Sequence, residues 1–101
     1  MTNGPRDIDQ LRRSLRHHMP ELRKRYGVEF LGLFGSYLHG NAGDDSDLDL
    51  LVRFYRTPGL LGFVELENHL SDMLGVRVDL VMAEALKPSI RRRVLAEVES
   101  V

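Results

Sequence analysis

Two neighbouring segments carry the most informative pattern in this chain: Leu33-Phe34-Gly35-Ser36-Tyr37-Leu38-His39-Gly40 and Ser46-Asp47-Leu48-Asp49-Leu50-Leu51-Val52. The leucine and valine content of the second segment, and the alternation of acidic with apolar residues at its start, predict a strand. Residues i and i+2 of a strand point to the same face, so we expect Asp47 and Asp49 to project together.

A pair of carboxylates on one face favours a bound cation, because two adjacent negative charges otherwise repel each other. Magnesium binds a few carboxylate oxygens together with substrate phosphates. The preceding Gly35 permits close approach of the backbone to a phosphate, and Ser36 adds a hydroxyl donor. The two segments together therefore predict a metal-dependent nucleotide site.

The composition is that of an ordinary globular protein and predicts one domain. The chain has 101 residues, of which 43% are hydrophobic and 29% charged. No apolar stretch approaches the length of a membrane span, so we expect no association with a membrane. The chain contains no cysteine, which excludes disulfides, thiolate zinc sites and cysteine nucleophiles, and which is compatible with the cytoplasmic location that we expect. The formal net charge of −1 gives no global positive field, so we expect no direct binding to nucleic acid.

The N-terminal part predicts a helix after a short polar segment. Residues 1–6 are polar and are expected to be disordered. Apolar residues recur every three or four positions over residues 7–26, which predicts a helix that Pro20 kinks or splits and that ends at Gly27. Residues 28–34 then predict a mostly buried strand.

The following residues alternate between strands and helices. Residues 35–46 are rich in glycine, asparagine and aspartate, as loops are. Two further strands are predicted at residues 47–54 and 76–82, and the broad apolar stripe of residues 60–74 predicts a helix between them. Residues 83–98 are expected to be helical at least after Pro88, which suits the first turn of a helix.

This order of elements predicts an α/β (α+β) fold, in which a small mixed β-sheet has helices packed against it. We assign the whole chain, residues 1–101, to a single domain. Within it, residues 28–82 form the expected catalytic core and residues 83–101 the expected C-terminal helix.

A third acid, Asp79, lies alone among apolar residues of the last predicted strand. Charged residues are rarely buried unless they are paired or bound to a metal. If this strand lies beside the Asp47/Asp49 strand, the acids form a cluster suited to two metals roughly 3.5–4 Å apart, as in in-line phosphoryl or nucleotidyl transfer. Alternatively, Asp79 is an exposed acid facing Arg77 or Arg53, and the acids of the earlier strand form a solvated edge.

The combined pattern resembles the DNA polymerase β-type nucleotidyltransferase superfamily, and in particular its minimal nucleotidyltransferase (MNT) branch. The resemblance rests on the phrase Gly-Ser-x-x-x-Gly from Gly35, on Ser-Asp-x-Asp-Leu-Leu-Val from Ser46, and on the later strand acid Asp79. The sequence Ala85-Leu86-Lys87-Pro88 after that strand is also similar to this branch. The resemblance covers the chain from about Glu29 onward.

The resemblance implies a role for each motif residue. Gly35 and Ser36 would contact the triphosphate of a nucleoside triphosphate, and Asp47 and Asp49 would hold two Mg²⁺ ions. Asp79 would ligate the catalytic metal and take the proton from the incoming hydroxyl as a general base.

Two further motif residues, His39 and Ser46, complete the nucleotide-binding candidates. The family often has arginine at the position of His39, and an arginine is always charged whereas a histidine is only partly protonated near neutrality. We therefore expect weaker or pH-sensitive binding of the triphosphate. Tyr37 and Tyr55 are candidates for contact with the nucleotide base.

Members of this branch are commonly antitoxins encoded beside a HEPN-domain ribonuclease toxin, which they silence by transferring AMP from ATP to a toxin tyrosine. The resemblance thus implies a protein adenylyltransferase with ATP as donor and a HEPN-like toxin as partner. Two alternatives stay open: a nucleotidyltransferase with a small-molecule acceptor, and a non-catalytic antitoxin that acts by binding alone. The sequence leaves the oligomeric state open.

Overall fold

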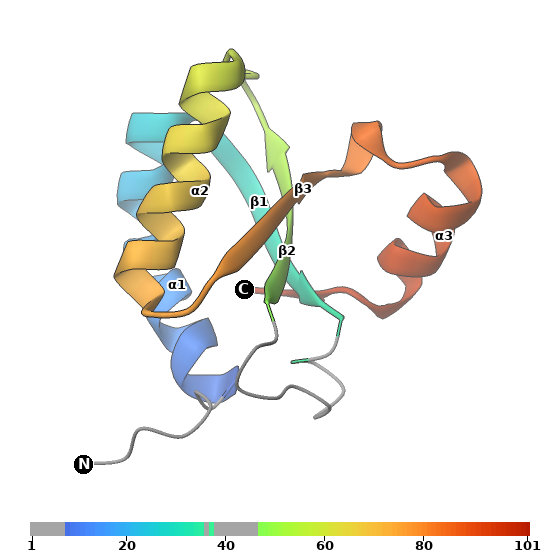
Figure 1. The fold of residues 1–101 in the computed structure, drawn as a ribbon, viewed down its shortest axis with the longest axis horizontal. Helices are drawn as coiled ribbons and strands as arrows, with labels where there is room; N and C mark the ends of the chain where they lie inside the picture. Colours follow the sequence, from blue (N-terminus) through green and yellow to red (C-terminus); the bar gives the residue numbers. More distant parts are fainter. Residues whose placement is uncertain (1–7, 36, 38–46) are drawn as a thin grey trace.

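The computed structural model describes residues 8–35, 37 and 47–101 (Figure 1). Residues 1–6, which we expected to be disordered, lie outside the described residues. Most of the expected loop of residues 35–46 does so too. The elements in chain order are α1 (Ile8–Tyr26), β1 (Val28–Phe34), β2 (Leu48–Phe54), α2 (Leu60–Leu74), β3 (Val78–Met82), the 3₁₀ turn η1 (Ala83–Ala85), α3 (Pro88–Glu97) and β4 (Glu99–Ser100).

The strands form a four-stranded sheet in the order β3-β2-β1-β4. β1 pairs antiparallel with β2 and with β4, whereas β2 and β3 are parallel. A parallel pair needs a crossover, which α2 supplies between these two strands. The expected α/β (α+β) fold with a mixed sheet is therefore confirmed.

The two faces of the sheet have separate cores. On one face, α1 and α2 pack against strand residues such as Leu48, Leu50 and Val52, which have no exposed surface (Figure 1). On the other face, Leu51 packs against Ala83 and Val94, beneath α3. The period-two alternation of β2 thus serves two layers rather than one buried and one solvated face.

Splitting of the first helix at Pro20 was one of the two outcomes expected from the sequence, and it does not occur. α1 runs unbroken from Ile8 to Tyr26 with Pro20 inside it. Leu15 and Leu22, on either side of the proline, are both fully buried against the sheet. We attribute the continuity to this packing, which offsets the lost helical hydrogen bond.

The expected C-terminal helix over residues 83–101 is wrong at both ends. Its first residues form η1, and α3 ends at Glu97, after which Glu99 and Ser100 pair with β1. Gly32 of β1 makes room for this segment, because a Cβ there would lie 2.5 Å from Val98 Cγ2.

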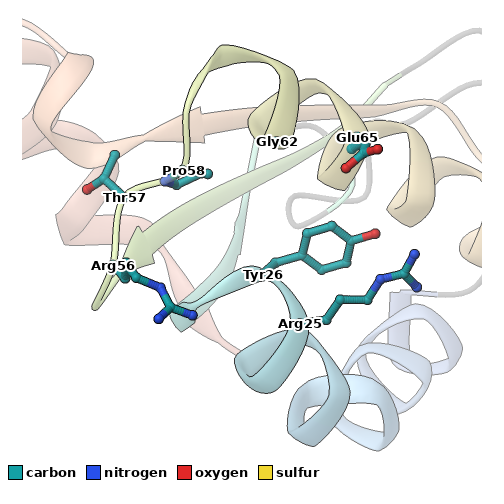
Figure 2. Close-up of a pocket in the computed structure, with 7 residues that line it drawn as sticks. All are labelled: Arg25, Tyr26, Arg56, Thr57, Pro58, Gly62 and Glu65. Atoms are coloured by element: carbon teal, nitrogen blue, oxygen red, sulfur yellow. The ribbon is translucent and has the colours of Figure 1, made fainter.

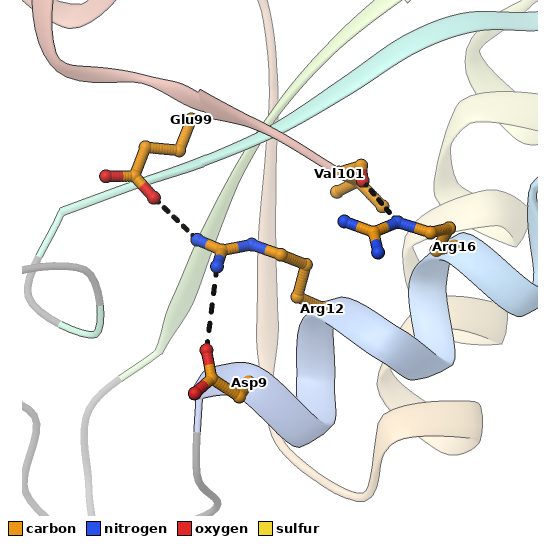
Figure 3. A network of polar contacts seen from close by, with 5 residues as sticks. All are labelled: Asp9, Arg12, Arg16, Glu99 and Val101. Atoms are coloured by element: carbon orange, nitrogen blue, oxygen red, sulfur yellow. Dashed lines mark hydrogen bonds and ion pairs between the residues drawn. The ribbon is translucent and has the colours of Figure 1, made fainter.

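Polar contacts with α1 and β1 hold the last residues in place. Arg12 Nη2 lies 2.6 Å from Glu99 Oε1 and its other amino group lies 3.6 Å from Asp9, while Arg16 Nε donates to the Val101 carbonyl at 2.9 Å (Figure 3). The Val101 amide donates to the Leu31 carbonyl at 3.0 Å. The partners of Glu99 and Val101 are 70 or more residues away along the chain, so a local sequence pattern does not reveal them.

In the part of the chain that the structure describes, no helix combines the length and the apolar character needed to cross a membrane.

Candidate active site

Asp49 and Asp79 lie side by side on neighbouring strands. In the parallel pairing of β2 with β3, Asp49 is directly opposite Asp79, and Leu48 and Leu50 are opposite Val78 and Leu80. Because these four apolar residues point into the α1/α2 core, the two acids point to the other face of the sheet. The expectation that the two strands are neighbours is therefore confirmed.

Asp47 lies one residue before β2 and has a cationic neighbour. Arg77 Nη1 is 3.7 Å from Asp47 Oδ1, and the Arg77 side chain is 79% exposed. The Arg77 carbonyl also accepts a hydrogen bond from the Leu48 amide at 2.8 Å, which fixes the start of the parallel pairing. Asp79 is exposed, as the alternative expected. Arg77, its possible partner in that alternative, lies instead against Asp47, where solvent screens the ion pair.

Asp49 has the electrostatic signature of a crowded carboxylate. Its pKa is raised from 3.8 to about 6, mostly by burial and further by the negative charges of Asp79 and Asp47 and by a side-chain hydrogen bond with Asp79. Each of these causes disfavours the ionised form of Asp49. A cation bound beside Asp49 would oppose these effects and favour its ionised form.

Gly35 brings the backbone against this cluster. It directly follows Phe34, which is paired with Asp49 across β1 and β2. Gly35 has a φ of +85°, and a Cβ built on it would lie 2.1 Å from Asp49 Oδ2. Only glycine satisfies both conditions, so the backbone here is adjacent to the carboxylate in a way that any side chain would prevent.

The remaining candidate residues either belong to segments that the structure does not describe or lie away from the acid cluster. Ser36, His39 and Ser46 are outside the described residues. Tyr37 is only 7% exposed and belongs to the α1/α2 core, so it is not available to a nucleotide base. Tyr55 follows the far end of β2 and donates its hydroxyl to the Arg23 carbonyl.

A cavity of about 400 Å³ lies at that same far end and is distinct from the acid cluster (Figure 2). β2 rises about 3.3 Å per residue, so Asp49 and Phe54 are roughly 16 Å apart. The lining residues come from the end of α1, the β2–α2 connection and the first turns of α2: Arg25, Tyr26, Arg56, Thr57, Pro58, Gly62 and Glu65. Neither Asp49 nor Asp79 is among them.

The donor chemistry of the acid cluster fits a hard divalent cation. Among the described residues, no three or more His, Cys, Asp or Glu side chains are already arranged as a metal site. Asp49 and Asp79 are nevertheless adjacent carboxylates, and magnesium takes oxygen ligands from one or two carboxylates and from substrate phosphates. The assignment of Asp47, Asp49 and Asp79 as metal ligands stays a prediction.

Sequence reasoning missed two residues that touch the strand bearing Asp79. Glu67 and Ser71 of α2 accept hydrogen bonds from the β3 amides of Leu80 and Val78. Their spacing of four residues, next to the buried Leu66 and Leu70, was the available signal. The sequence alone did not say which strand they would face.

The site thus combines a mixed sheet, two acids paired across parallel strands, and a glycine directly after β1. The chain belongs to the nucleotidyltransferase domain family, which matches residues 15–101. It is 50% identical over 91 residues to the protein adenylyltransferase MntA of Thermococcus cleftensis, an overlap that covers 90% of this chain and 92% of that protein.

Solved structures agree with this assignment. One described as a minimal nucleotidyltransferase has a TM-score of 0.81 and 38% identity, and the match covers 98% of this chain and all of that one. A toxin–antitoxin crystal structure with AMP-PNP has a TM-score of 0.65 and 26% identity, covering 93% of this chain and 68% of that chain. The chain is thus an enzyme of the minimal nucleotidyltransferase type.

Proposed function

We propose that this protein is a magnesium-dependent adenylyltransferase that transfers AMP from ATP to a hydroxyl of a HEPN-family ribonuclease toxin and thereby acts as its antitoxin in the cytoplasm. The observation that carries the proposal is the pairing of Asp49 with Asp79 beside Asp47. The similarity to MntA, a protein adenylyltransferase, supports a protein acceptor. The similarity to a toxin–antitoxin structure with AMP-PNP supports an adenine nucleotide and a toxin partner.

Each residue of the site has a role in the proposed reaction. Asp47 and Asp49 would hold Mg²⁺, which when bound supplies positive charge to the triphosphate. Gly35 leaves room for the phosphates beside Asp49, and Ser36, His39 and Ser46 are proposed to contact the nucleotide. Asp79 would complete the metal site and accept the proton of the attacking hydroxyl.

The proposed transfer is a single displacement at the α-phosphorus of ATP. The acceptor oxygen forms a bond to this phosphorus while the bond to the bridging oxygen of the β-phosphate breaks. Pyrophosphate leaves, and the hydroxyl proton passes to Asp79. The toxin then carries AMP as a phosphodiester, on a tyrosine if it follows the pattern that the sequence resemblance implies.

Incubation of the protein with ATP labelled at the α-phosphate, Mg²⁺ and the purified HEPN-family toxin tests this proposal. Label on the toxin is the expected result. Label on an added small-molecule hydroxyl compound instead would favour a small-molecule acceptor. Stable binding of the toxin without transfer would favour an antitoxin that acts by docking alone.

A further inference from the structure

We infer that Glu67 and Ser71 of α2 are positioning residues for Asp79, because they cap the outer edge of the strand that carries it. The inference rests on the proposed function for its metal-binding and activity readouts. β3 is an edge strand of the sheet and pairs with β2 alone among the described strands. Its outward amides would otherwise have no partner in a ladder.

Two hydrogen bonds satisfy this edge on either side of Asp79. The Val78 amide donates to Ser71 Oγ at 3.0 Å, and the Leu80 amide donates to Glu67 Oε2 at 2.9 Å. Asp79 is the residue between these two donors. The strand is therefore held to the helix on one side and to β2 on the other, with the acid between the two attachments.

The acceptors belong to a rigid part of the molecule. α2 buries Leu66, Leu70 and Leu74 in the core, with at most 3% of each residue exposed. The Ser71 hydroxyl itself donates to the Glu67 carbonyl at 3.0 Å, which orients the serine oxygen toward β3. The buried leucines hold the helix in place. The two acceptors on it therefore fix the register of β3 against β2.

The register of β3 against β2 determines where the Asp79 carboxylate lies. A slip of one residue in the pairing would turn Asp79 to the opposite face of the sheet, and a smaller shift would move it away from Asp49. Groups that orient metal ligands through hydrogen bonds commonly change metal affinity or activity by about 10- to 100-fold when removed. Glu67 and Ser71 act here through the backbone rather than on the carboxylate itself.

The test compares four variants of the full chain: Glu67→Ala, Ser71→Ala, Glu67→Gln and, as a matched control on the same helix, Glu65→Ala, whose side chain lines the distant cavity. Mn²⁺ affinity is measured by electron paramagnetic resonance, AMP transfer by kcat and KM for the toxin, and folding by circular dichroism. We expect Glu67→Ala to weaken Mn²⁺ binding and lower kcat by about 10-fold or more, with KM for the toxin unchanged.

The conservative variant separates positioning from charge. Glu67→Gln keeps an oxygen acceptor for the Leu80 amide, so Mn²⁺ affinity and kcat should stay close to those of the wild type, as they should in Glu65→Ala. Ser71→Ala should lower both in the same direction as Glu67→Ala.

Three results would overturn the inference. The first is a folded Glu67→Ala protein with wild-type Mn²⁺ affinity and kcat. The second is equal damage in Glu67→Gln and Glu67→Ala, because charge rather than hydrogen bonding would then matter. The third is a wild-type protein that binds no Mn²⁺. Absence of AMP transfer by the wild type would contradict the proposed function, while Mn²⁺ affinity across the variants would still test the positioning role.

Discussion

Asp49 and Asp79 are directly opposite each other in the parallel pairing of β2 and β3. Residues that are directly opposite each other on neighbouring strands project to the same face of the sheet, so this pairing brings the two carboxylates together. This placement disfavours the ionised form of Asp49, because burial and the neighbouring acids raise its pKa to about 6. Strongly shifted carboxyl pKa values cluster at functional sites, so this crowding supports the proposed site.

The first prediction concerns stability without metal. The folded protein binds more protons than the unfolded chain between about pH 4 and pH 6, because the pKa of Asp49 rises from 3.8 to about 6. The stabilisation by protonated Asp49 is therefore present below this window and is lost as the pH rises through it. In EDTA, Asp49→Asn should be more stable than the wild type at pH 7, with a smaller gain near pH 4.5. Urea unfolding at both pH values measures this, and a pH-independent difference would contradict it.

The second prediction concerns metal addition. Mg²⁺ bound only by the folded state should raise the stability of the wild type by about 1.4 kcal/mol at ten times its dissociation constant. Asp49→Asn removes one of the proposed ligands, so the same Mg²⁺ concentration should stabilise it much less. Thermal unfolding of both proteins with and without Mg²⁺ gives the comparison. Equal shifts in the two proteins would place the metal elsewhere.

The third prediction concerns Gly35. Gly35→Ala should abolish AMP transfer, because its Cβ would lie 2.1 Å from Asp49 Oδ2 and its φ of +85° strains any L side chain. Gly59→Ala is the matched control, since an added Cβ there meets nothing within 4 Å. The transfer assay should show wild-type activity for the control. Full activity of Gly35→Ala would show that Asp49 need not stay where the structure places it.

The fourth prediction concerns the attachment of α3. Arg91 donates from Nε to the Ala83 carbonyl and from Nη2 to the Leu86 carbonyl, both at 3.1 Å, and so ties the helix to the segment that leaves β3. Arg91→Met should lower the free energy of unfolding by about 1–3 kcal/mol, because both carbonyls lose a charged donor. The neighbouring exposed Arg92, replaced by Met, should change it little. Urea unfolding of the two variants decides between these outcomes.

The sequence was sufficient where the pattern is local. The bounds of β1 (Val28–Phe34) and α2 (Leu60–Leu74) agree with the expectation, because an apolar run between turn residues and a 3.6-residue stripe ended by Gly75 are complete signals in themselves. The alternation in Asp47-Leu48-Asp49 likewise indicated an acidic face before the strands were placed.

The sequence failed where contacts join distant segments. β4 pairs with β1 where Gly32 leaves room for Val98, and this pairing replaces the end of the expected C-terminal helix. Two further features depend on the register of one strand against the next. They are the placement of Arg77 against Asp47 and the capping of β3 by Glu67 and Ser71. Periodicity along one element does not determine that register.

The most direct measurement is the transfer of AMP from labelled ATP to the HEPN-family toxin by wild-type protein, Asp47→Asn and Asp49→Asn in the presence of Mg²⁺. Circular dichroism first establishes that all three proteins are folded. If the carboxylates hold the metal, the wild type labels the toxin and neither variant does. Near-wild-type labelling by either variant would contradict the account.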